Sequence, residues 1–455
     1  MIQVNDIIQV NIETLVAGGD GLSRLDGMAI FVPDTVPGDQ IRAKVVSIKK
    51  NYAHAHLKEV LQSSQHRVKP PCHHAGSCGG CQWQHIDYEE QLRAKKAIIE
   101  DCFTRIAGVD VPVKDVISND QLTGYRCKVQ YPVQQVAKTD PFIVGYYQKG
   151  THHVVDIETC PVQPSTIDVI TRFIRISVAQ MGLKAYVPKN RKGLLRHIVY
   201  KYSETHQNLL VIFVINARQA PEKLIDLSKT LRDKFPQVAG VLVNYNIQNN
   251  TIILGSKTQL IDGVSYIEEK LNDLRFKISA DSFFQTHPKM AFRIFQEVYN
   301  MLKLCVEQAS LLDIYAGVGT FSLFLEPLAS SVLAIEESPS AVRDFHDNIQ
   351  SAGLDDKIRC IQGKAEIILK ELYDNEERFD VILLDPPRKG CERAVIDYIA
   401  SMTDRYIVYV SCNPATLARD VKALIAKGFR LEYTQPFDMF SFTHHIESVS
   451  ILKKG

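Results

Sequence analysis

The sequence predicts a multidomain α/β protein: an N-terminal β-barrel over residues 1–60, a central α+β domain over 61–275 and a C-terminal doubly wound sheet over 276–455. Three observations support this. The first 60 residues hold short alternating apolar and polar runs between turns, as in small barrels. From Asp281 onward, strand-like and helix-like segments alternate, which indicates a parallel sheet covered by helices. A chain of 455 residues is also too long for one compact core.

The barrel is predicted from three alternating segments, residues 7–12, 29–32 and 40–48. Glycine- and proline-containing turns at 18–21 and 36–39 separate them. Several short strands at this spacing are typical of a small closed sheet.

The central domain begins with a loop rich in cysteine, glycine and histidine, followed by a helix over 88–107 that Gly108 ends. We expect this helix to pack on the C-terminal domain. Mixed elements follow. The predicted helices are 166–181 and 221–234, and the predicted strands are 125–133, 143–147, 153–157, 194–202, 209–216, 240–245 and 251–255.

Composition narrows the class of protein. Apolar residues make up 45% and charged residues 23%, which is ordinary for a globular protein. No apolar run reaches the roughly 18 residues of a membrane span. The N-terminus lacks a basic region followed by an apolar one, so we expect a cytoplasmic protein without a membrane partner. We also expect a monomer. Ten cysteines in such a protein argue against a disulfide framework.

Basic residues are unevenly distributed although the formal net charge is only +1. Residues 40–70 contain seven Lys or Arg against the single acid Glu59, and residues 184–201 contain six and no acid. Such segments are the pattern expected for phosphate binding, and a solvated basic face is the alternative.

Chemistry is concentrated after three predicted strands of the C-terminal domain. The run at 311–314 leads into the loop Tyr315-Ala316-Gly317-Val318-Gly319. The run at 381–384 leads into Asp385-Pro386-Pro387-Arg388-Lys389-Gly390, and the run at 406–410 into Ser411-Cys412-Asn413-Pro414. Ligands of open α/β sheets bind at the carboxyl ends of the strands. A nucleotide-like cofactor, a carboxylate and a thiol at one edge suggest methyl transfer to a pyrimidine carbon.

Cys412 is the predicted nucleophile. Carbon C5 of uracil is too weak a nucleophile to take a methyl group unaided, and a thiolate that adds to C6 activates it. We expect a partly exposed site near a helix start to lower the pKa of this cysteine. A buried, inert strand cysteine is the alternative reading.

These motifs resemble the S-adenosylmethionine-dependent RNA uracil-5-methyltransferases. Five signatures occur in the family's order, and a sixth closes the chain: Phe283-Phe284-Gln285, the loop 313–319, Glu336, 385–390, 411–414 and Thr443-His444-His445-Ile446-Glu447. The likeness covers nearly the whole chain and implies a Rossmann-like methyltransferase domain. The N-terminal segment resembles the TRAM module, an OB-like RNA-binding barrel.

The resemblance implies roles for individual residues. Cys412 is the expected nucleophile, and Glu447 the base that removes the C5 proton. The residues expected to bind S-adenosylmethionine are Gln285, Tyr315, Glu336 and Asp385. The chain departs from the family at Ser441 and Phe442, where proline and histidine are usual.

Four cysteines form a second constellation: Cys72, Cys78, Cys81 and Cys160. Four thiolates bind zinc or an iron–sulfur cluster, and spacing alone does not choose between them. The resemblance favours a structural [4Fe–4S] cluster, because the pattern is that of the iron–sulfur subset similar to 23S rRNA (uracil-5-)-methyltransferases.

The sequence therefore predicts methyl transfer to C5 of a specific uridine in RNA, with large-subunit ribosomal RNA as the target implied by the cluster cysteines. The alternative target is uridine 54 of tRNA. A radical iron–sulfur enzyme would need its cluster beside the cofactor loop, and a non-catalytic RNA-binding protein would not need Cys412 together with Glu447.

Overall fold

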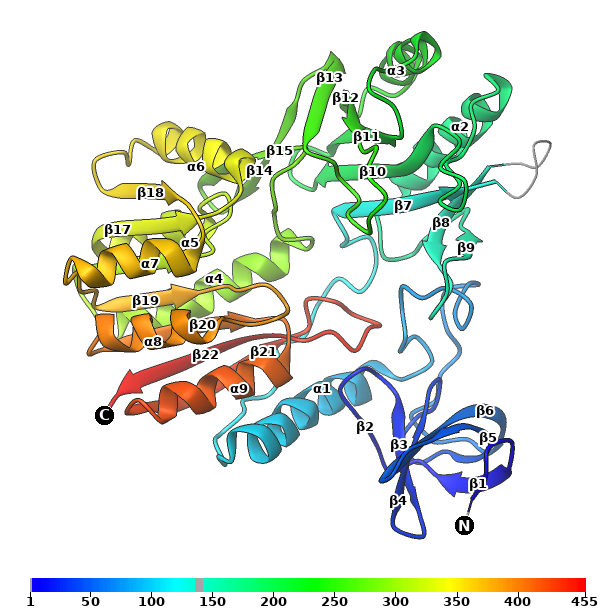
Figure 1. The fold of residues 1–455 in the computed structure, drawn as a ribbon, viewed down its shortest axis with the longest axis horizontal. Helices are drawn as coiled ribbons and strands as arrows, with labels where there is room; N and C mark the ends of the chain where they lie inside the picture. Colours follow the sequence, from blue (N-terminus) through cyan, green and yellow to red (C-terminus); the bar gives the residue numbers. More distant parts are fainter. Residues whose placement is uncertain (1, 136–141) are drawn as a thin grey trace.

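The computed structural model describes residues 2–135 and 142–455 (Figure 1). Three large sheets and one separate hairpin follow one another along this part of the chain. The predicted multidomain α/β architecture is confirmed, with a barrel first and a doubly wound sheet last. Among the described residues, no helix combines the length and apolarity needed to cross a bilayer.

The N-terminal sheet has the order β1-β5-β6-β4-β3-β2. Its strands are β1 Ile7–Asn11, β2 Thr14–Leu15, β3 Gly21–Leu25, β4 Met28–Val32, β5 Gln40–Ile48 and β6 Tyr52–Gln62. Alternate residues of β5 are buried, among them Ile41, Ala43 and Val45, which gives the barrel its core. Asp39, before β5, is fully buried and accepts hydrogen bonds from the amides of Val36 and Ser64.

The central sheet has the order β13-β12-β11-β10-β7-β8-β9. Its strands are β7 Lys128–Gln134, β8 Ile143–Tyr147, β9 Val154–Asp156, β10 Leu195–Ser203, β11 Asn208–Ile215, β12 Val238–Tyr245 and β13 Lys257–Gly263. Along β11, Leu209, Val211 and Phe213 pack with helices α2 Ser165–Gln180 and α3 Glu222–Lys234. The alternate residues Leu210 and Ile212 face the C-terminal domain, so both faces of the sheet are buried.

The predicted strand at 251–255 is wrong. These residues form an irregular loop, and β13 begins only at Lys257. The side-chain amide of Asn246 donates to the carbonyls of Ile252 and Ile253, and Asn244 bonds both backbone groups of Gly255. The loop thus satisfies its polar backbone groups with side chains instead of a strand partner.

A hairpin, β14 Tyr266–Leu271 and β15 Leu274–Ser279, connects the central and C-terminal sheets. It contacts β10 and β11 on one side and helix α6, Pro339–Ala352, on the other. The predicted domain division at residue 275 lies inside this hairpin, and the domain limits remain a prediction.

The C-terminal sheet has the order β18-β17-β16-β19-β20-β22-β21, and all pairings are parallel except those of β22. Its strands are β16 Ala309–Ile314, β17 Ala329–Glu336, β18 Ile358–Gln362, β19 Val381–Leu384, β20 Tyr406–Ser411, β21 Phe429–Phe437 and β22 Glu447–Lys454.

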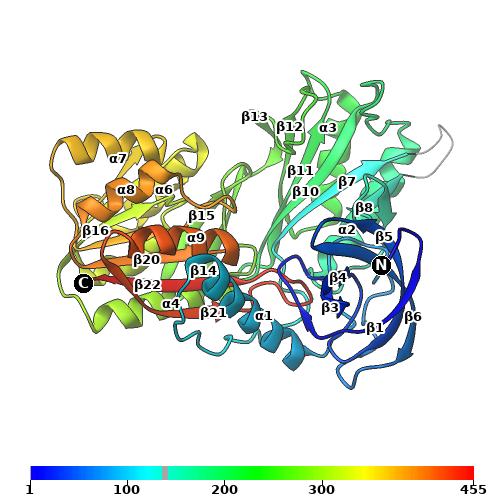
Figure 2. The same cartoon turned by 60° about the horizontal axis from the view of Figure 1, so that its bottom comes forward.

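Helices cover both faces of this sheet (Figure 2). Buried side chains of α4 Pro288–Lys303, α5 Thr320–Leu325 and α6 Pro339–Ala352 join one core. Those of α7 Ala365–Asp374, α8 Arg393–Met402 and α9 Pro414–Ile425 join the other. Helix α6 begins after Ser338, and Gly353, whose φ is 68°, follows its last residue.

The helix that follows the cysteine-rich loop lies against α9 (Figure 2). It comprises α1 Tyr88–Cys102 and a π-helical turn, Phe103–Ala107, and Gly108 ends it in the left-handed conformation. Ile98, Ile99 and Phe103 pack into the same core as α7, α8 and α9. Although it precedes the central sheet in sequence, α1 is thus part of the C-terminal layer.

Candidate active site

Three predicted functional segments meet at one edge of the C-terminal sheet. β16 pairs with β19, and β19 with β20, with Ile314 opposite Leu384 and Leu384 opposite Tyr409. Because these strands are parallel, the residues that follow them emerge side by side. They are the glycine loop after β16, Asp385 after β19 and Cys412 after β20.

Glu447 reaches the same edge through an antiparallel strand. β22 pairs with β20 so that Ser448 lies opposite Ser411, which makes Glu447 the neighbour of Cys412 at the strand ends. Glu447 is buried, and its carboxyl forms no hydrogen bond within the described part of the chain. The predicted nucleophile and base therefore lie in one site.

The electrostatics of Cys412 differ from the prediction. Burial raises the pKa of its thiol to about 11; the nearby carboxyls Glu447 and Asp385 raise it further, whereas Arg388 lowers it. The expected lowering of this pKa is therefore wrong. The start of α9 does not compensate for desolvation and two facing carboxyls, both of which disfavour the thiolate.

Asp385 and Glu447 also influence each other. Burial raises the pKa of Asp385 to about 7, with a contribution from Asp313. Burial, followed by the charge of Asp385, raises the pKa of Glu447 well above its usual range, whereas Arg388 lowers it. Two carboxyls in a desolvated site do not ionise independently, so this pair retains a proton near neutral pH.

The glycine loop has the form of a cofactor cradle. Gly317 and Gly319 have φ values of 58° and 88°, and a Cβ on Gly317 would meet no atom within 4 Å. Glu336 Oε2 accepts the Gly317 amide hydrogen at 2.9 Å, so the carboxylate at the end of β17 lies beside the loop. The buried Asp313 Oδ1 has no hydrogen-bond partner in the described structure. Free space, a carboxylate and an unpaired acceptor suit a ribose-bearing ligand.

The other predicted cofactor residues differ in what they contact. Gln285 Nε2 is 3.5 Å from Asp385 Oδ2, which brings Gln285 into the site. Tyr315 has a φ of 67° and interacts through its hydroxyl with Cys391. Phe283 is 54% exposed and thus available to stack on a base.

The four predicted metal-ligating cysteines line one cavity of about 30 Å³, together with Tyr125 and Thr443. Within the described ranges, however, no three His, Cys, Asp or Glu side chains are arranged around a single metal ion. The amides of His74 and Gly80 each lie 3.4 Å from a cysteine sulfur of this loop. The four cysteines thus share one cavity, and their role as metal ligands remains a prediction.

Part of the second basic segment, residues 184–201, is buried inside the protein. Arg196 is buried and donates to the carbonyls of Asn246 and Gln248. Lys201 is buried and donates to the carbonyls of Ser279 and Ser282, before Phe283. Arg191 and Lys192 are exposed, which leaves them as candidates for phosphate contact.

Sequence reasoning missed a buried polar cluster beside the site. Tyr88 and Lys95 of α1 both donate to Asp438, which follows β21. The signal was present in the sequence: Tyr88, Gln91 and Lys95 recur at helical spacing on the face that also carries Ile98 and Ile99. Polar residues on a buried helix face need partners.

Comparisons with known proteins agree with this geometry. Residues 87–455 match the family described as tRNA (uracil-5-)-methyltransferase. The chain belongs to this family. Residues 3–58 match the TRAM domain, which confirms the prediction for the N-terminal barrel.

Relatives extend along nearly the whole chain. An uncharacterized RNA methyltransferase of Halalkalibacterium halodurans is 35% identical over 450 residues, covering 99% of this chain and 97% of that protein. One of Oceanobacillus iheyensis is 36% identical over 450 residues, covering 98% and 96%. The crystal structure of Pyrococcus abyssi tRNA (uracil-54, C5)-methyltransferase in complex with S-adenosyl-L-homocysteine has a TM-score of 0.76 at 25% identity, covering 98% of this chain and 100% of that chain.

The protein is thus an S-adenosylmethionine-dependent RNA methyltransferase of the uracil-C5 family, as the sequence predicts. RNA is its substrate, consistent with the TRAM domain.

Proposed function

We propose that this enzyme methylates C5 of one class of uridine in structured RNA through a covalent bond between Cys412 Sγ and uracil C6. The observation that carries this proposal is the adjacency of Cys412 and Glu447 across β20 and β22, at the edge that also bears Asp385 and the glycine loop. A nucleophile and a base on one uracil are what this reaction requires.

S-adenosylmethionine supplies the methyl group as an electrophilic sulfonium substituent. Cys412 gives up its thiol proton to solvent and adds to C6 as the thiolate, which breaks the C5–C6 double bond and makes C5 nucleophilic. C5 then takes the methyl group, and S-adenosylhomocysteine is the leaving group. Glu447 removes the remaining proton from C5. The electron pair of that C–H bond re-forms the double bond, and the C6–S bond breaks to return the thiolate. Glu447 must be ionised to take this proton, and the charge of Arg388, which lowers the pKa of Glu447, favours that form.

Cofactor binding is proposed for Glu336, Gln285, Tyr315 and Asp385. Glu336 lies beside Gly317 and is suited to ribose hydroxyls, while Gln285 and Asp385 lie close together near the thiol. Tyr315 shapes the loop through its backbone, because its hydroxyl interacts with Cys391.

A [4Fe–4S] cluster is proposed for the cavity of Cys72, Cys78, Cys81 and Cys160. The support for this proposal is the cysteine pattern together with the single cavity that the four cysteines line, since the described residues form no group of three or more ligands around one point. The guanidinium of Arg126 interacts with Cys81 and Cys160 and would balance thiolate charge. The cluster would join the loop before α1 to Cys160 and supply no chemistry to the methyl transfer. About four irons per anaerobically purified chain would support this, and zinc alone would overturn it.

Large-subunit ribosomal RNA is the proposed target, supported by the resemblance of the cysteine pattern to the ribosomal enzymes. Uridine 54 of tRNA is the second candidate, favoured by the likeness to the Pyrococcus abyssi enzyme. Mass-spectrometric mapping of 5-methyluridine in both RNAs from cells with and without the gene tests the two. A 5-methyluridine missing from one RNA identifies the target, and no change in either RNA contradicts the proposed activity.

A further inference from the structure

The connection between β21 and β22, residues 438–446, is a buried loop that leads directly into Glu447. Asp438 and Ser441 are fully buried. Phe442 has a φ of 67°, in the left-handed region that a phenylalanine rarely adopts. Such a conformation persists only where surrounding contacts hold it. The contacts around this loop therefore determine where its backbone lies.

Three side chains of α1 make the central contacts. Lys95 Nζ donates to Asp438 Oδ1 at 2.5 Å, and Tyr88 OH donates to Asp438 Oδ2 at 2.7 Å. Gln91 Oε1 accepts the amide hydrogen of Phe442 at 3.0 Å. The three residues are three and four positions apart, so they form one stripe on the helix.

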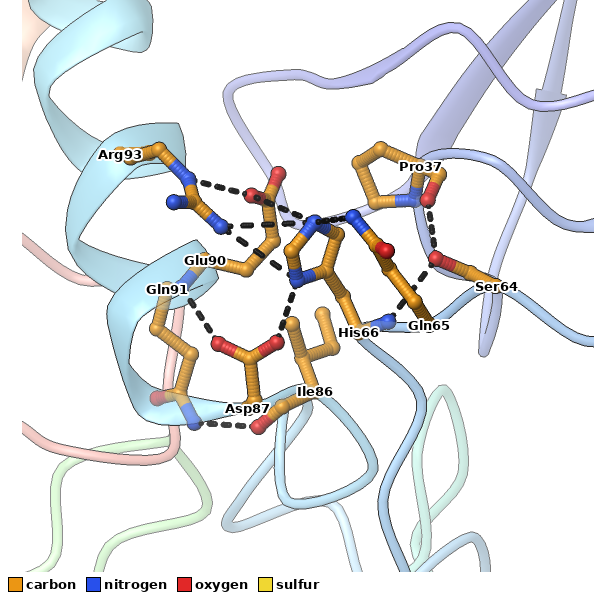
Figure 3. Close-up of polar contacts among 9 residues, drawn as sticks. All are labelled: Pro37, Ser64, Gln65, His66, Ile86, Asp87, Glu90, Gln91 and Arg93. Carbon is orange, nitrogen blue, oxygen red and sulfur yellow. Dashed lines mark hydrogen bonds and ion pairs between the residues drawn. The ribbon is translucent and has the colours of Figure 1, made fainter.

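The start of α1 is itself fixed, as Figure 3 shows. Asp87 Oδ1 accepts the amide hydrogen of Glu90 and caps the helix, and Asp87 Oδ2 lies 2.6 Å from His66 Nδ1 in the segment that follows the barrel. Gln91 Nε2 donates to the Ile86 carbonyl at 2.9 Å (Figure 3), which turns the amide oxygen of Gln91 toward the loop. The stripe is therefore held in place from the barrel side.

Glu447 has no comparable support of its own. Its carboxyl forms no hydrogen bond to any residue that the structure describes, although the residue is buried. The direction of this side chain therefore depends on the backbone of β22 and of the loop before it.

We propose that Tyr88, Gln91 and Lys95 are positioning residues, which aim Glu447 at the C5 proton by fixing the loop 438–446. The inference rests on the proposed role of Glu447 as the base. None of the three touches the substrate; they act through Asp438 and Phe442. A buried ion pair gives little net stability over apolar side chains of similar size, so stability alone does not account for Lys95 and Asp438.

The same contacts explain how the chain tolerates its departures from the family motif. Ser441, at the usual proline position, donates to Asp438 at 2.7 Å and accepts from Asn119 Nδ2 at 3.0 Å. Phe442 packs with Tyr125 and Val162 in a small apolar cluster. Hydrogen bonds and packing thus hold this turn without a proline.

The test compares formation and release of the covalent adduct. The variants are Tyr88→Phe and the double variant Lys95→Met/Asp438→Asn, which removes the ion pair but retains an acceptor for Tyr88 and Ser441. Lys96→Met is the matched control, because Lys96 is the next residue of α1 and pairs with Asp115 at the surface. Full-length, anaerobically purified proteins react with ribosomal RNA and tRNA transcripts containing uridine or 5-fluorouridine, and detergent-stable adduct is measured over time.

We expect the rate of adduct formation on 5-fluorouridine RNA to stay within about twofold of wild type. Release of the enzyme from the adduct with uridine RNA should slow by roughly 10- to 100-fold, which is the effect of misplacing a reacting group by about 1 Å. Adduct should then accumulate on natural uridine in both variants, as in Glu447→Gln. Lys96→Met should match wild type in both rates.

Release at the wild-type rate in both variants, beside slow release in Glu447→Gln, would overturn the positioning role alone. Equal losses of formation and release would also overturn it, because fewer folded molecules lower both rates together. Wild-type release in Glu447→Gln would refute the proposed base, and this inference with it.

Discussion

The glycine loop after β16 offers a contrast between two substitutions only two residues apart. A Cβ on Gly319, whose φ is 88°, would lie 2.8 Å from the ring of buried Phe345. A Cβ on Gly317, whose φ is 58°, would meet nothing within 4 Å. We predict that Gly319→Ala mainly destabilises the domain, whereas Gly317→Ala mainly weakens cofactor binding.

The magnitudes follow from these distances. A left-handed backbone costs alanine roughly 1–2 kcal/mol, which applies to both variants. Overpacking against Phe345 adds about 1–3 kcal/mol to Gly319→Ala alone. At roughly 2–4 °C of Tm per kcal/mol in a domain of this size, Gly319→Ala should melt clearly below Gly317→Ala. Gly317→Ala should weaken S-adenosylhomocysteine binding by about tenfold or more, because its methyl group would occupy open space in the loop that is proposed to hold the cofactor.

Differential scanning calorimetry measures the first difference and isothermal titration calorimetry the second. Equal Tm values for the two variants would refute the close approach of Gly319 to Phe345. Unchanged binding of S-adenosylhomocysteine by Gly317→Ala would refute the assignment of this loop as the cofactor cradle.

Three further predictions test the site and its RNA contacts. Cys412→Ala should abolish methylation and the 5-fluorouridine adduct, because the thiol is proposed to contact uracil. Binding of S-adenosylhomocysteine, measured by calorimetry, should stay near wild type. Near-normal turnover would exclude a covalent mechanism. Burial raises the pKa of Asp385 in the folded protein to about 7, above its unfolded value, so the folded state binds this proton more tightly and loses stability as pH rises from about 4 to 7; Asp385→Asn should reduce this loss in urea denaturation, and the opposite pH trend would refute it. The double variant Arg191→Gln/Lys192→Gln should weaken RNA binding. It should also reduce the slope of the logarithm of the binding constant against the logarithm of salt concentration by roughly 0.7–0.9 for each phosphate that it no longer binds. An unchanged slope would exclude phosphate contacts by both residues.

Local sequence patterns were sufficient for much of the fold. Each predicted strand of the C-terminal sheet ended where turn chemistry changed, so Asp385 and Cys412 could be assigned to strand ends. The prediction of a strand at 251–255 failed because the apolar run from Ile252 to Leu254 can form a strand only where a partner strand pairs with it. The side chains of Asn244 and Asn246 bind its backbone instead, and that interaction depends on the tertiary structure.

The candidate site shows the same limit. The sequence placed Cys412 and Glu447 in separate motifs, and their adjacency depends on β22 lying between β20 and β21, a strand order that periodicity does not reveal. The pKa of Cys412 was misjudged because the sequence shows the helix start after it but not the carboxyls that face it. Arg196 and Lys201 looked like surface charges, yet both bind internal carbonyls.

The barrel packs against the catalytic domain and is structurally continuous with it. Leu15 and Val36 pack into the core that includes Trp83, and Trp83 Nε1 donates to the Gly19 carbonyl at 2.9 Å. The Trp83 amide in turn donates to the Phe442 carbonyl, and Gly19 lies against His444. We therefore expect deletion of the barrel to expose Trp83 and to free the loop before Glu447, and so to impair RNA binding together with the proton removal proposed for Glu447. Only charge substitutions that leave this packing intact can separate how the enzyme holds RNA from how it completes the reaction.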